Sequence, residues 1–127
     1  VYFSLEVRMR TALALLVCLF PLLAQLDQGF IIATATDASG GAVINARTIA
    51  ISEQTGLRRE AETGTDGRVV LSNLPVGTYR LEVEATGFKK YSQTGIKVDA
   101  AARVAVEIKL ELGAVTESVT VTASAVQ

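Results

Sequence analysis

Apolar and polar residues alternate strictly along Tyr79–Thr86, in the second half of the chain. The apolar positions are Tyr79, Leu81, Val83 and Ala85, and the polar positions are Arg80, Glu82, Glu84 and Thr86. A period of two predicts a β-strand with one face against a core and the other face in water. Pro75 and Gly77 come just before it. They predict a turn, because Pro fixes φ and Gly tolerates positive φ.

After Gln25 the rest of the chain shows the same kind of pattern, in short segments separated by Gly, Asp, Asn or Pro. These segments are 30–36, 43–52, 58–63, 69–71, 96–98 and 103–112. Short strands at such spacing are typical of an all-β sandwich or barrel, and they predict about seven strands. Segment 58–63 has charges on one face, as edge strands often do.

Within this sandwich the pattern also predicts where particular side chains lie. Phe88 is expected to pack on the core, and Lys89, Lys90 and Tyr91 are expected to stay at the surface. Ile49 and Ile51 are expected to share one face of their strand. The segment 103–112 is expected to direct alternate residues inward: Val104, Val106, Ile108, Leu110 and Leu112.

The N-terminal 24 residues differ in composition from the rest. Arg8 and Arg10 precede an apolar run, Ala12–Leu23, which is followed by Ala24 and a polar residue. This order predicts a secretory signal peptide over residues 1–24, with residues 1–8 as an upstream extension if Met9 is the start. The run is interrupted by Pro21 and is shorter than the roughly 20 residues of a membrane span. A buried N-terminal helix is the alternative.

The chemistry of the chain excludes several classes of site. It has no histidine, a net charge of −1 and one cysteine, Cys18, inside the apolar run. Ser-His-Asp triads and histidine metal sites are therefore excluded, and nothing suggests nucleic-acid binding. Asp37, Asp66 and Asp99 lack the spacing of a calcium loop and are expected to cap turns. We predict no catalytic residue, no metal site, no cofactor and no enzymatic activity.

Three stretches carry a family resemblance. They are Asp37–Val43, then Thr55–Arg59 with Thr65–Gly67, and finally Leu74–Val83 with Gly87 and Phe88. Together they resemble the carboxypeptidase regulatory-like domain, a transthyretin-like or prealbumin-like module related to Cna B-type domains. The resemblance implies a seven-stranded Greek-key β-sandwich over residues 25–112, preceded by a hydrophobic signal helix and followed by an extended tail, 113–127.

The tail contains a second resemblance. Its alternating residues are Glu117, Ser118, Val119, Thr120, Val121, Thr122 and Ala123. They resemble a TonB box, the energy-coupling segment of TonB-dependent outer-membrane receptors, which a regulatory-like domain often precedes. The resemblance implies an exported, periplasmic domain at the N-terminus of a receptor, ahead of plug and barrel, with no membrane insertion of its own. These seven residues would pair with TonB by strand addition.

Two alternatives remain open on the residues alone. The tail pattern also fits an eighth strand of the sandwich or a plain linker. The chain as a whole also fits a free-standing secreted module that binds carbohydrate or protein. No catalytic or ligand-binding motif in the sequence distinguishes between these alternatives.

Overall fold

The computed structural model describes residues 2–17, 28–114 and 116–123. Within these ranges the chain forms one α-helix and eight β-strands. In chain order they are α1 (Tyr2–Val17), β1 (Gln28–Thr36), β2 (Arg47–Ser52), β3 (Arg58–Glu62), β4 (Arg68–Pro75), β5 (Gly77–Glu84), β6 (Lys90–Val98), β7 (Arg103–Lys109) and β8 (Ser118–Thr122).

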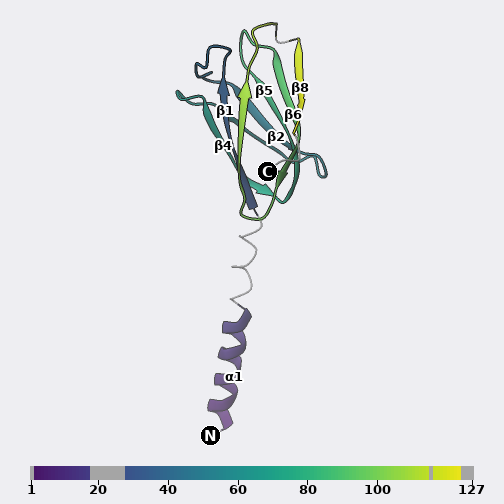
Figure 1. Cartoon of the computed structure of the whole chain (residues 1–127). Helices are drawn as coiled ribbons and strands as arrows, with labels where there is room; N and C mark the ends of the chain where they lie inside the picture. Colours follow the sequence, from purple (N-terminus) through teal and green to yellow (C-terminus); the bar gives the residue numbers. More distant parts are fainter. Residues whose placement is uncertain (1, 18–27, 115, 124–127) are drawn as a thin grey trace.

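The strands form two sheets. One has the order β4-β1-β7 and the other β3-β2-β5-β6-β8. Strand β1 runs parallel to β7 and β6 runs parallel to β8, whereas the other neighbouring strands are antiparallel. Figure 1 shows β8 beside β6 at one side of the sandwich. The predicted β-sandwich is confirmed, and the tail adds an eighth strand to the predicted seven.

The alternation of β5 places its apolar residues in the core, as the sequence predicts. Tyr79, Leu81 and Val83 are buried, and so are their partners on β2, Ser52, Ala50 and Thr48. Residues paired across a sheet share a face, so these β2 residues also face inward. The main core is completed by residues from both sheets, including Ile31, Ala33, Ala35, Leu71, Leu74, Tyr91, Ile96, Val98, Val106, Ile108 and Leu110.

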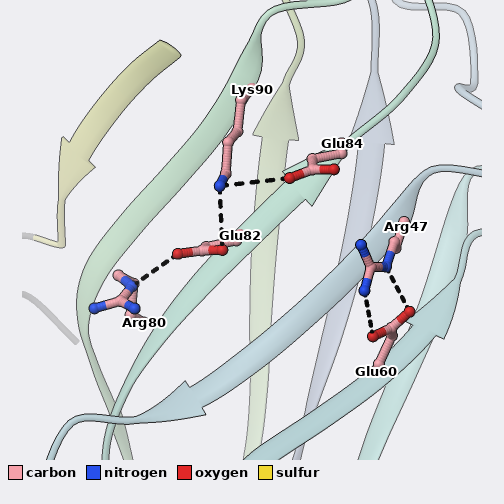
Figure 2. A network of polar contacts seen from close by, with 6 residues as sticks. All are labelled: Arg47, Glu60, Arg80, Glu82, Glu84 and Lys90. Carbon is pink, nitrogen blue, oxygen red and sulfur yellow. Dashed lines mark hydrogen bonds and ion pairs between the residues drawn. The ribbon is translucent and has the colours of Figure 1, made fainter. Parts of the chain in front are cut away.

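Ile49 and Ile51 share a face, as predicted, but it is the outer face of the five-stranded sheet. They are nevertheless only 2% and 7% exposed. Their paired neighbours are charged residues with long side chains: Glu60 and Glu82 beside Ile49, and Arg58 and Arg80 beside Ile51. Figure 2 shows part of this charged layer, in which Arg47 bonds Glu60, and Glu82 lies between Arg80 and Lys90. Aliphatic stems of such side chains cover apolar surface while their charges remain in water.

Three predictions of placement were wrong. Tyr91 is 6% exposed rather than at the surface, because it pairs with Val83 and so shares the core face of its sheet. Leu112 is 75% exposed, because β7 ends at Lys109 and the chain turns away from the core. The strand expected over 43–52 begins only at Arg47, since Asn45 has a φ of 57°, outside the extended region. Phe88 packs against the core, as predicted.

Aspartates cap turns as predicted at two positions. The Asp37 Oδ1 atom accepts hydrogen bonds from the backbone N–H groups of Ser39 (2.9 Å) and Gly41 (3.0 Å) and from the Ser39 hydroxyl. The Asp66 carboxylate accepts one from the N–H of Arg68 at 3.1 Å. In this second turn Gly67 has a φ of 74°, and a Cβ there would lie 2.6 Å from the carbonyl oxygen of Ala35. Only glycine fits this position without strain.

The N-terminal segment is helical up to Val17 in α1, and the side chains of residues 2–12 are exposed. The predicted cleavage point after Ala24 lies outside the described residues. Among the helices that the structure describes, none is both long and apolar enough to span a membrane.

Candidate functional site

The predicted partner-binding residues form the edge strand β8 and its two flanks. Val119 pairs with Tyr91 and Val121 with Gln93 in the parallel ladder to β6. At its two ends, the N–H of Lys90 donates to the Glu117 carbonyl at 2.8 Å, and the N–H of Ala123 donates to the Thr94 carbonyl at 2.9 Å. The alternative of an eighth strand is therefore what the structure contains, and all seven residues lie along one sheet edge.

The two valines of β8 continue the apolar core toward the sheet edge but are not fully covered there. Val119 is half-buried beside Tyr91, whereas Val121 is 38% exposed. Ser118, Thr120 and Thr122 are exposed on the opposite, outer face of the sheet. Strand β8 thus buries little of its own surface, and Val121 leaves apolar area uncovered on the core side of the sheet.

The connection from β7 to β8 is fixed by backbone and charge together. Lys89 donates its N–H to the Glu111 carbonyl at 2.8 Å, and the Gly113 N–H donates to the Gly87 carbonyl at 3.1 Å. The Lys89 Nζ atom lies 3.5 Å from a carboxylate oxygen of Glu111 and equally far from one of Glu117. The two carboxylates are largely exposed, so each pair contributes at most about 1 kcal/mol. The second pair places the Glu117 side chain beside Lys89 at the start of β8.

The two sheets have four edges, and three of them are protected in ways that natural proteins use against unwanted strand pairing. Strand β3 has four charged residues out of five, β7 has three out of seven, and β4 begins with Arg68 and ends with Pro75. Strand β8 has the sequence Ser-Val-Thr-Val-Thr, with neither charge nor proline. Among the four edge strands that the structure describes, it is the one with neither a charged residue nor a proline.

A second feature lies at the end of the sandwich, between the β1–β2 and β5–β6 connections. A hollow of about 420 Å³ is lined by Asp37, Ala42, Val43, Ile44, Asn45, Ala85, Thr86 and Phe88. A smaller hollow of about 260 Å³ adjoins it, sharing Asn45, Ala85 and Thr86 and adding Arg47 and Glu84. Together they combine an aromatic ring with amide, hydroxyl and carboxylate groups.

Hydrogen bonds of Thr63 and Asp37 hold the segments that surround this hollow. The buried Thr63 hydroxyl donates to the Val43 carbonyl at 2.6 Å and accepts from the Ala46 N–H at 2.9 Å. On the other side, the Ser39 hydroxyl and then the Gly41 N–H hold the pKa of Asp37 below its usual value by bonding its charged form. The hollow was not predicted from the sequence, because residues 43–46 were included in the strand expected over 43–52.

Metal binding has no support in the described part of the chain, where no group of three or more Cys, Asp or Glu side chains is placed to hold an ion. Glu82 and Glu84, which share the outer face of β5, are paired with Arg80 and Lys90. They form the solvated, charged face that their spacing predicts.

Comparison with known proteins identifies the family. The family model of the carboxypeptidase regulatory-like domain matches residues 31–111, from within β1 to just beyond β7. The chain belongs to the carboxypeptidase regulatory-like family. The resemblance to this family, predicted from the three sequence stretches, is thereby confirmed. A search of curated proteins found no match for this regulatory-like chain.

Solved structures share the fold of the regulatory-like domain. The minor pilin GBS52 of Streptococcus agalactiae matches with a TM-score of 0.57 at 12% identity, over 70% of this chain and 46% of its own. The Bacillus anthracis TIE protein matches with 0.56 at 18% identity, over 68% and 17%. The 3-chlorocatechol 1,2-dioxygenase of Rhodococcus opacus 1CP matches with 0.55 at 10% identity, over 68% and 61%. This chain thus spans less than two thirds of each of these proteins, and the likeness is one of fold.

Proposed function

We propose that this chain is a non-catalytic, periplasmic, N-terminal domain of a TonB-dependent outer-membrane receptor, and that its tail pairs with TonB by strand addition. The observation that supports the proposal best is that β8 forms a sheet edge with neither charge nor proline. The family match and the predicted signal peptide are consistent with an exported domain.

Strand addition uses the two features that β8 offers. An extended backbone supplies hydrogen-bond donors and acceptors, which give affinity, and alternate side chains fix the register. The sequence Ser118–Thr122 has β-branched residues at four of five positions. Such residues favour the extended conformation.

The experiment is a binding measurement between the chain from Gln25 onward and the isolated C-terminal domain of a TonB protein. This chain contains all eight strands, and the core has no member from the described part of the N-terminal helix. We expect saturable binding in biolayer interferometry. The double variant Val119→Pro, Val121→Pro should weaken it by at least about ten-fold, because each proline removes an N–H from the ladder that holds β8 extended along β6.

A matched control places the same residue in another edge. The substitution Arg59→Pro lies in β3, the opposite edge of the same sheet, and should leave TonB binding unchanged if the variant is folded. Circular dichroism and thermal melting establish folding for each variant. Equal binding by the wild-type chain and the Val119→Pro, Val121→Pro variant would contradict strand addition through the tail.

A second function is favoured by the end hollow. As a free-standing secreted module, the domain would bind a carbohydrate there, with the Phe88 ring against a sugar face and Asp37 and Asn45 toward its hydroxyls. A glycan array with the chain from Gln25 tests this. Binding that is lost in Phe88→Ala but kept in the double-proline tail variant would support the module, and a blank array would contradict it.

A further inference from the structure

We infer that the partner strand pairs with the outer edge of β8 while β8 stays docked on β6, so that the partner extends the five-stranded sheet by a sixth strand. This inference rests on the proposed function and specifies how the site would be used. The alternative is that the tail first leaves β6 and is then captured as a free segment.

The backbone of β8 divides into an inner and an outer set. The Glu117 carbonyl and the Ala123 N–H both bond to β6. Backbone groups of successive strand residues point to opposite edges, so Val119 and Val121 belong to the same inner set. Ser118, Thr120 and Thr122 therefore present their N–H and C=O groups outward, away from β6. These are the groups that an added strand would use.

The side chains near this edge leave room for a partner and indicate its chemistry. Val121 remains 38% exposed on the core side of the sheet, next to Gln93. A sixth strand with an apolar residue at the facing position would cover it. The outer face at this edge has only the hydroxyls of Ser118, Thr120 and Thr122. A partner strand with uncharged, β-branched residues fits both faces.

Docking also prepares β8 for binding. Its backbone is already extended and fixed in register along β6 over Ser118–Thr122. A partner that binds the docked strand does not need to order these residues, whereas capture of a free tail would. Release would in addition break the ladder to β6 and uncover Tyr91, which is buried beneath this edge.

A reversible disulfide separates the two modes. Ser92 and Thr120 are direct partners on the outer face of β6 and β8, and the chain from Gln25 has no cysteine of its own. The double variant Ser92→Cys, Thr120→Cys, when oxidised, locks β8 onto β6 without changing its outward backbone groups. The single variants Ser92→Cys and Thr120→Cys, alkylated, control for the loss of each hydroxyl.

The measured quantity is the affinity for the C-terminal domain of TonB before and after reduction. We expect the dissociation constants of the locked and the reduced double variant to agree within about two-fold. A difference of about 1.4 kcal/mol in binding free energy would instead change the dissociation constant ten-fold. If locking weakens binding at least about ten-fold and reduction restores it, the docked mode is overturned while the proposed function stands. If the wild-type chain does not bind the TonB domain, the proposed function fails and this inference fails with it.

Amide hydrogen exchange provides an independent readout on the unmodified chain. The inner amides of Val119 and Val121 should exchange slowly before the partner is added. The outer amides of Ser118, Thr120 and Thr122 should become slow only in its presence. Slow exchange of the outer set on binding, with the inner set protected throughout, supports the docked mode. Loss of protection at Val119 and Val121 on binding would overturn it.

Discussion

The buried hydroxyl of Thr63 offers the sharpest test of how the end of the sandwich is held together. Replacing Thr63 with Val keeps the shape of the side chain and removes one donor and one acceptor. The N–H of Ala46 and the carbonyl of Val43 then lose the partner that the structure gives them. Both residues are buried.

The magnitude follows from these two groups. A buried polar group left without its partner costs about 1–3 kcal/mol. Because residues 44 and 45 are exposed and let water approach, we take the lower end of that range, about 1–1.5 kcal/mol, for each group. The expected loss for Thr63→Val is about 2–3 kcal/mol, a large part of the 5–15 kcal/mol typical of a domain. For a domain of this size it corresponds to a fall in Tm of about 10–20 °C.

The assay is urea unfolding followed by circular dichroism, with Thr63→Ser as the matched variant. Serine keeps both hydrogen bonds and loses one methyl group, which costs about 1 kcal/mol. The valine variant, although more hydrophobic, should therefore be the less stable of the two. If Thr63→Val unfolds at the wild-type midpoint, or is more stable than Thr63→Ser, the reasoning is refuted.

Three further predictions test other parts of the fold. Gly67→Ala should lower stability more than Gly56→Ala in thermal melts, because both glycines have a φ of 74° but only a Cβ at residue 67 meets a backbone oxygen; equal losses would contradict this. Burial raises the pKa of Tyr79. The stabilisation that its neutral phenol gives the folded state is therefore fully present below about pH 10 and is lost as pH rises through the folded-state pKa. In the Tyr79→Phe variant the urea midpoint should fall less between about pH 8 and 11 than in the wild type. At neutral pH the variant should lose about 1 kcal/mol of stability, because it lacks the hydrogen bond to the Pro75 carbonyl. Hydrogen bonds lower the pKa of Asp37. The stabilisation by its charged carboxylate is therefore present above its ordinary pKa of 3.8 and is lost as pH falls below it. The stability of Asp37→Asn should be less sensitive to acid, and an unchanged acid midpoint would count against this role.

Periodicity predicted the strands well where one face is buried and the other is wet. Strand β5 follows this rule at every position, since Tyr79, Leu81 and Val83 are buried and the intervening residues are partly exposed. Strand β2 does not follow it, because Ile49 and Ile51 are buried on the outer face under long charged side chains. A one-dimensional pattern does not contain the neighbouring strands that supply this cover.

Prediction was least successful where the backbone leaves the extended conformation. Asn45 and the end of β7 at Lys109 interrupt segments that were expected to be continuous strands, so the end hollow and the exposure of Leu112 had no signal in the pattern. The tail residues were identified from sequence as a strand-forming segment. Their parallel pairing with β6 depends on the long connection from β7, which local sequence does not encode.

The parallel pairing of β1 with β7 has a consequence for the order of folding. Phe30 pairs with Arg103 and Thr36 with Lys109, so the central strand of the smaller sheet finds one of its two partners far along the chain. Such non-local pairing slows folding, because a long loop must close before any contact compensates for its entropy. During synthesis, which starts at the N-terminus, the chain therefore cannot complete this sheet until residue 109 is available. A fragment that stops before Arg103 would leave the outer edge of β1 open to pairing with other chains.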